Sequence, residues 1–226
     1  MAEFKLPTET VELPSKGLLY PADSPLASGT IEMKYMTAKE EDILTNQNYI
    51  QKGTVIDKLL QSLIVTEGVN FNDLLIGDKN AIMVAARILS YGKDYSFSYG
   101  GVEQVVDLSS LETKPIDDAL FEKRQNEFEF ALPTSGNVVT FKLLVHEDES
   151  KIDRELKGLS KLDKEGSFEV TTRLKHMITS VNGSREQKDI RNFVDTALLA
   201  RDARALREYY KAINPDILLQ FIPEGG

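Results

Sequence analysis

The sequence predicts an α+β protein that is mostly helical, with a small antiparallel β module in the middle and an extended N-terminal arm. Apolar residues recur at helical spacing over much of the chain, and alternating runs flank Gly100-Gly101. Half of the eight prolines fall within the first 30 residues. We expect four segments in the 226 residues: an arm over 1–29, a strand with helices over 30–92, a β module over 93–145, and a helical region over 146–226 that forms one compact unit with 30–92.

The arm contains a turn at Pro14-Ser15-Lys16-Gly17, where glycine readily supplies a positive φ. Apolar residues surround this turn: Leu13, Leu18, Leu19 and Tyr20. In a free tail these apolar side chains would be exposed to water, so we expect the arm to pack on this chain or on a neighbour. Leu18, Leu19 and Tyr20 are therefore candidate partner-binding residues.

Regular elements follow the arm. Residues 30–35 alternate between apolar and polar side chains, which is typical of a half-buried strand. Thr37 and Glu40 have the spacing of a capping box and predict the start of a helix. The helices expected in this region cover 38–46, 54–65 and a segment that begins near Asp78 and ends at Gly92.

The middle of the chain reads as strands. Residues 95–99 and 102–108 alternate on either side of Gly100-Gly101, which predicts a β-hairpin. Residues 127–132 and 138–144 indicate two more strands, so we expect one β module over 93–145. The remaining elements expected are helices over 147–162, 169–180, 186–199 and 201–213, and a last strand over 217–222.

Composition excludes several classes of site. The formal net charge is −9 and the pI is near 4.9, which disfavours non-specific binding to nucleic acid or to an anionic membrane. The chain has no cysteine, so disulfides, thiolate metal sites and cysteine nucleophiles are excluded. The N-terminus lacks the pattern of a signal peptide, and no apolar run approaches the roughly 18 residues that would span a bilayer.

Few residues suggest chemistry. His146 and His176 do not occur in a metal-binding spacing such as HExxH. The acidic run 147–149, with Asp153, could suggest calcium, but acids also favour the start of a helix because of its positive dipole end. Phosphate-binding glycine loops and a nucleophile elbow are absent. We therefore expect no catalytic, cofactor-binding or metal-binding residue, no cofactor, and no enzymatic activity.

Arginines recur at every third position near the C-terminus, at Arg201, Arg204 and Arg207. Together with the basic residues of 185–191 they could form a basic face, but acidic residues are interleaved. Three interpretations remain open: a salt-bridged solvent face, a protein–protein contact, or a contact with nucleic acid. The second makes Arg201, Arg204 and Arg207 candidate partner-binding residues.

The order of several motifs resembles that in T-even-type baseplate proteins of contractile-tailed bacteriophages, and in the baseplate hub subunit and assembly family in particular. The motifs are Leu13-Pro14-Ser15-Lys16-Gly17-Leu18-Leu19-Tyr20-Pro21, Met36-Thr37-Ala38-Lys39-Glu40-Glu41, Asp107-Leu108-Ser109, Phe141-Lys142-Leu143-Leu144, Asn182-Gly183 and Arg201-Asp202-Ala203-Arg204-Ala205-Leu206-Arg207. Relatives often carry paired cysteines like a zinc knuckle at the hairpin turn. Here Tyr99-Gly100-Gly101 occupies that place, so no zinc is expected.

The resemblance implies a non-enzymatic structural or assembly protein of the tail baseplate. Such a protein would contact other baseplate and tail proteins in a hetero-oligomeric assembly, without nucleic acid or membrane. It would be assembled in the host cytoplasm and located in the virion. The alternative in the same setting is a tail-assembly chaperone that is absent from the mature virion. A hydrolase that uses scattered carboxylates and a nucleic-acid-binding adaptor represent other classes.

Overall fold

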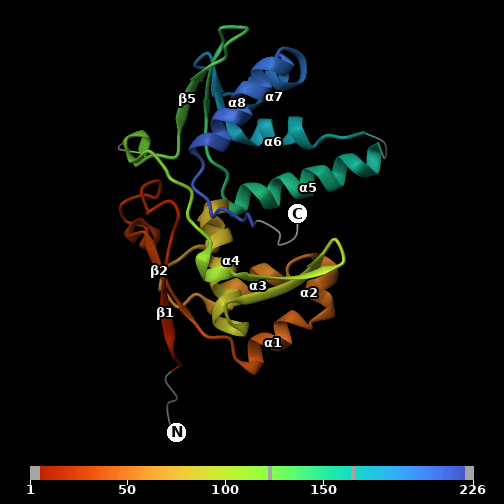
Figure 1. Cartoon of the computed structure of the whole chain (residues 1–226). Helices are drawn as coiled ribbons and strands as arrows, with labels where there is room; N and C mark the ends of the chain where they lie inside the picture. The colour runs from red at the N-terminus through yellow and green to blue at the C-terminus, as the bar shows by residue number, and fades with distance from the viewer. Residues whose placement is uncertain (1–5, 122–123, 164–165, 222–226) are drawn as a thin grey trace. The chain divides into compact units, whose positions relative to one another are not determined.

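The computed structural model describes residues 6–121, 124–163 and 166–221 (Figure 1). Over these residues it confirms the α+β class, with eight α-helices and three small antiparallel sheets. The contacts divide the chain into two compact units, which are described separately. The described residues of unit 1 are 6–71, 77–118 and 215–221, and those of unit 2 are 72–76, 119–121, 124–163 and 166–214.

Unit 1 begins with a two-stranded sheet. β1 (Thr8–Glu12) pairs antiparallel with β2 (Thr30–Lys34), with Val11 opposite Ile31. β2 is the strand that the alternation predicted, and its Ile31 is buried on one face. β1 lies within the segment expected to be an arm, so part of the arm belongs to a sheet. Residues 1–5 of that arm lie outside the described residues.

Four helices follow in the chain. The capping box expected at the start of α1 is present, and Glu40 accepts a hydrogen bond from the Thr37 backbone N–H at 3.0 Å. Burial alone would raise the pKa of Glu40, but the ion pair with Lys34 and the bonds from Thr37 lower it to about 2. The helices are α1 (Ala38–Leu44), α2 (Gln47–Lys52), α3 (Val55–Leu63) and α4 (Ile76–Tyr91); α2 was not predicted, and the Asn46 side chain caps it.

A β-hairpin follows α4. β3 (Asp94–Tyr99) pairs antiparallel with β4 (Val102–Asp107), and Tyr99 lies opposite Val102. Gly100 and Gly101 form the two-residue turn with φ values of 60° and 83°. The antiparallel pairing confirms the predicted hairpin. Two consecutive positive φ values explain why both turn positions are glycine.

Unit 2 contains a three-stranded antiparallel sheet in the order β5-β6-β7. β5 (Phe128–Ala131) pairs with β6 (Val138–Phe141), and β6 pairs with β7 (Ile178–Val181). β7 falls in a segment that was predicted to be helical. It is extended because it completes the sheet: the Thr140 and Ser180 hydroxyls lie 2.7 Å apart across the pair.

The expected division of the chain is wrong in two respects. The strands of the module predicted over 93–145 belong to separate sheets in different units, because β6 pairs with the distant β7 and β3 pairs only with β4 within the described strands. The C-terminal helices form a unit with β5 and β6, not with 30–92. Local patterns predicted the strands but could not predict this long-range pairing.

Four helices complete unit 2, and the last of them packs aromatic rings against strands β5 and β6. Tyr209 stacks on Phe130 with a centroid distance of 5.0 Å and meets the ring of Phe141 edge-on at 5.9 Å. Leu206 and Ile213 of the same helix as Tyr209 are buried. The helices are α5 (His146–Leu162), α6 (Glu169–Met177), α7 (Gln187–Thr196) and α8 (Ala200–Ile213), as Figure 1 shows.

Ion pairs join the helices of unit 2. Glu155 of α5 accepts two hydrogen bonds from Arg191 of α7, at 2.9 and 3.2 Å, and lies 2.9 Å from Nε2 of His176 on α6. The bonds from Arg191, together with His176, lower the pKa of Glu155 to about 2 despite partial burial. Asp148 accepts the Val145 backbone N–H at 3.1 Å, so the acidic run serves the start of α5.

The last strand expected over 217–222 is not formed by the residues that the structure describes. Ile217 instead makes an isolated bridge with Thr113, and the Leu218 N–H donates to the Glu112 carbonyl at 2.8 Å. Residue 222 lies outside the described part. The chain after α8 therefore returns to unit 1 as an irregular segment.

Candidate functional site

The turn at Pro14-Ser15-Lys16-Gly17 is organised around Asp78. The Ser15 backbone N–H and hydroxyl donate to the Asp78 carboxylate at 2.9 and 2.6 Å, and the Tyr20 hydroxyl donates to it at 2.6 Å. Asp78 lies fully buried in the first turn of α4, and burial raises the pKa of its carboxyl group although these donors oppose the shift. The motif therefore attaches the arm to unit 1.

Of the three candidates in the arm, two are buried within unit 1. Leu19 and Tyr20 are only 5% and 3% exposed, respectively, and Leu13 packs there as well. Leu18 is half-buried. Of the two alternatives expected for the arm, its described part therefore follows the first: it packs on its own chain. Among these three side chains, Leu18 has the largest exposed fraction and is the most accessible to a partner.

The three arginines of α8 are all exposed. Arg204 pairs with Glu208 one turn later at 2.8 Å, whereas Arg201 makes no ion pair with described residues. Asp202 between them is buried and accepts the backbone N–H groups of Thr134 and Ser135 at 2.7 and 3.1 Å. Burial alone would raise the pKa of Asp202, but these bonds lower it.

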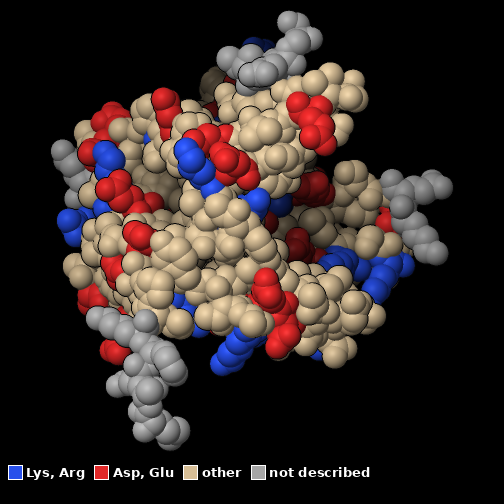
Figure 2. All heavy atoms as spheres, turned by 60° about the horizontal axis from the view of Figure 1, so that its bottom comes forward, with Lys and Arg blue, Asp and Glu red and all other residues tan. Residues whose placement is uncertain are grey.

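The other basic residues considered with them are largely occupied. Arg185 makes two hydrogen bonds to Glu127 at 2.8 and 3.0 Å, and Arg191 is paired with Glu155. Figure 2 shows basic and acidic side chains interspersed on the face that it presents. These contacts favour the interpretation of a salt-bridged surface for Arg185, Arg191 and Arg204, and leave Arg201 and Arg207 to be explained.

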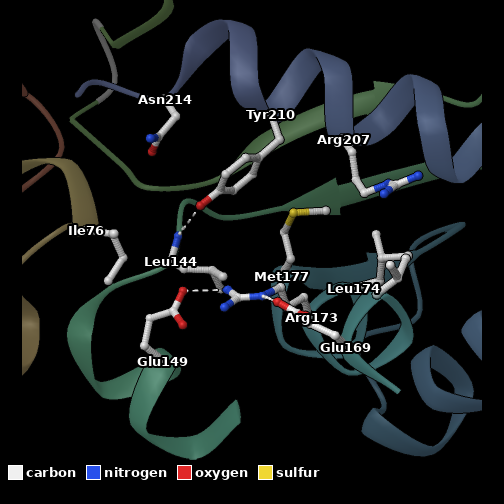
Figure 3. A pocket seen from close by; sticks show the side chains of 11 residues that line it. Ile76, Leu144, Glu149, Glu169, Arg173, Leu174, Met177, Arg207, Tyr210 and Asn214 are labelled. Carbon is white, nitrogen blue, oxygen red and sulfur yellow. Dashed lines mark hydrogen bonds and ion pairs between the residues drawn. The ribbon is translucent and has the colours of Figure 1, made fainter. Parts of the chain in front are cut away.

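Arg207 lies at a cavity of about 400 Å³ within unit 2. This size falls within the range of about 300–1,000 Å³ typical of ligand clefts. Figure 3 shows Tyr210 and Arg207 projecting from α8 on the side that faces α6. The lining residues are Ile76, Leu144, Glu149, Glu169, Val170, Arg173, Leu174, Met177, Arg207, Tyr210 and Asn214.

The polar groups of the cavity differ in whether they already have hydrogen-bond or ion-pair partners in the described chain. Arg173 is held between Glu149 at 2.6 Å and Glu169 at 3.2 Å. The Tyr210 hydroxyl accepts the Leu144 backbone N–H at 3.1 Å, and burial raises the pKa of Tyr210 to about 12, so the group keeps its hydrogen at neutral pH. Arg207 donates through Nε to the Ala203 carbonyl at 3.2 Å and makes no ion pair within the described chain.

Unit 1 has a separate apolar surface, which we call the hairpin surface: Tyr95, Tyr99, Val102, Leu219 and Phe221, all exposed. The three hairpin residues project from one face of β3–β4, since Tyr99 lies opposite Val102 and Tyr95 is two pleats away. Phe221 meets the ring of Tyr99 edge-on at 6.2 Å. A hollow of about 310 Å³ lies against this face.

Sequence reasoning missed the cavity, apart from Arg207. The spacing of Glu169 and Arg173 signals an ion pair on one helix, but nothing local brings Tyr210 of α8 beside them. Sequence reasoning also missed that Asp78 binds the arm. The one feature that could have indicated this is an acidic residue among the apolar residues at the start of a helix. Among the residues described, no group of three or more His, Asp or Glu is placed to hold a metal, and no helix is long and apolar enough to cross a membrane.

A comparison of the chain with models of protein families, with curated proteins and with solved structures finds no match.

Proposed function

We propose that this protein is a non-enzymatic structural or assembly component of the tail baseplate of a contractile-tailed bacteriophage, and that it acts through contacts with other tail proteins. The observation that carries the proposal is the hairpin surface of unit 1. Val102 is 55% exposed and Tyr99 is 58% exposed, beside the exposed Tyr95, Leu219 and Phe221. Contiguous exposed apolar side chains of this kind mark sites of protein contact.

The hairpin also has strand edges to offer. β3 and β4 pair with each other and with no further strand among those described. An isolated two-stranded ribbon is marginally stable, and its unpaired backbone groups are a template for an added strand. Aromatic residues, which dominate the contact energy of interfaces, line the same ribbon. Both features suit a surface that becomes covered in an assembly.

The order of the sequence motifs supports the baseplate setting, with host cytoplasm as the place of assembly and the virion as the destination. A tail-assembly chaperone is the alternative, since it would use the same kind of surface. Mass spectrometry of purified particles distinguishes the two: a structural component is present in a fixed amount, whereas a chaperone is missing from mature particles but required to produce them.

The test of the contact compares two substitutions on one strand. Val102→Asp places a charge in the hairpin surface. Val105→Asp is the matched control, because Val105 is also exposed, at 65%, but projects from the opposite face of the hairpin. In a phage that lacks the gene and is complemented with each variant, we expect Val102→Asp to reduce infectious particles while Val105→Asp does not. Equal yields from both variants and the wild type would refute the proposal.

A further inference from the structure

We infer that the cavity between α5, α6 and α8 binds a segment of another tail protein that presents an apolar side chain next to a carboxylate, and that Arg207 holds this carboxylate. This inference rests on the proposed function, because it names the chemistry of one partner. It concerns a different unit from the hairpin surface. It can therefore fail independently.

The walls of the cavity fit an apolar side chain. Leu144, Leu174 and Met177 are buried and supply carbon and sulfur atoms to the lining (Figure 3). Val170, on the first turn of α6, is 46% exposed and also lines the cavity. Filling such a space with a side chain removes apolar surface from water on both partners, at about 25 cal/mol per Å².

The polar groups select a carboxylate. Arg173 is already paired with both Glu149 and Glu169, so it does not require an additional anion. Arg207 uses only its Nε group, for a carbonyl of its own helix, and has no acidic partner in the described chain. Its two terminal nitrogen atoms can hold both oxygens of a carboxylate in a fork geometry.

Tyr210 adds a second donor to the same lining. Its oxygen accepts the Leu144 N–H, so its own hydrogen remains to be donated, and no acceptor for it is found in the described residues. These two donors lie beside the apolar part of the lining, so they match an acceptor group attached to an apolar one. An acidic residue adjacent in sequence or on a helix to a large apolar residue combines both chemistries in one protein segment.

The test uses charge reversal in the full chain. Arg207→Glu should reduce infectious particles at least about tenfold, the loss expected when one member of an interfacial charge pair is reversed. Arg154→Glu is the matched control, because Arg154 of α5 is also an exposed arginine whose Nε donates to a carbonyl four residues earlier, at 3.1 Å, but it does not line the cavity. Thermal melts establish that both variants fold, and Arg207→Gln replaces Arg207→Glu if the latter lowers the melting temperature.

Suppressor selection then identifies the occupant. Phages that regain yield with Arg207→Glu should carry an Asp or Glu changed to Lys or Arg in a different tail protein, beside an apolar residue. Suppressors within this chain, together with self-association of the wild type in sedimentation, would show that a second copy is the occupant and overturn the inference. Wild-type yield from the Arg207 variants would also overturn it, and the proposed function would stand if Val102→Asp still reduced assembly.

Discussion

Gly17 provides the sharpest test of how the arm is held. Its φ of 73° is in the left-handed region, and a Cβ atom at this position would lie 2.5 Å from the Ala27 carbonyl oxygen. Gly17→Ala therefore carries two penalties: about 1–2 kcal/mol for the left-handed backbone and about 1–3 kcal/mol for forcing the packed backbones apart. We expect a total loss of about 2–5 kcal/mol in the free energy of unfolding.

Gly100→Ala separates the two penalties. Gly100 also has a positive φ, of 60°, but nothing lies within 4 Å of a Cβ atom at this position. Its substitution should cost only the backbone penalty of about 1–2 kcal/mol. Urea unfolding followed by circular dichroism gives both values. If Gly17→Ala destabilises the protein no more than Gly100→Ala does, the close packing of the turn against residues 27–29 does not stabilise the fold and the argument is refuted.

Two further predictions concern unit 2. Leu206→Ala should lower the free energy of unfolding by about 2–5 kcal/mol because Leu206 is fully buried. The control Leu162→Ala should change it by less than about 0.5 kcal/mol, because Leu162 is 87% exposed. Equal losses for the two variants in urea unfolding would contradict this prediction. The folded-state pKa of Glu155 is lowered from 4.5 to about 2. The contribution of Glu155 to the free energy of unfolding is therefore present above pH 4.5 and is lost as the pH falls towards about 2. The stability difference between wild type and Glu155→Gln should shrink over that pH range in thermal melts, and a constant difference would exclude the ion pair as its source.

Local sequence signals predicted much of the secondary structure. The capping box at Thr37 and Glu40, the turn at Gly100-Gly101 and the apolar spacing of α8 each depend on residues within a few positions of one another. Their physics is local, because a cap, a tight turn and a helical face are each determined by neighbouring residues. The same holds for the acidic start of α5, where Asp148 bonds to the backbone of Val145.

Other elements depended on partners that are distant in the chain. Residues 178–180 were predicted to be the end of a helix but belong to β7, because β6 offers this segment a sheet edge. The arm was expected to be extended, yet β1 has a register with β2 that no local pattern specifies. Tertiary context overrides local propensity when the gain from pairing and burial exceeds a preference of less than about 1 kcal/mol per residue.

The candidate site shows the same division. The sequence by itself determined that the chain has no thiol chemistry, that its arm carries apolar residues which must be covered, and that arginines recur along its last helix. Only the tertiary structure decided that the Tyr20 hydroxyl is hydrogen-bonded to a buried Asp78, that Arg191 of α7 is paired with Glu155 of α5, and that Arg207 lies at a cavity. The physical reason is that burial and the pairing of charges depend on which helices pack together, and this is not a local property of the chain.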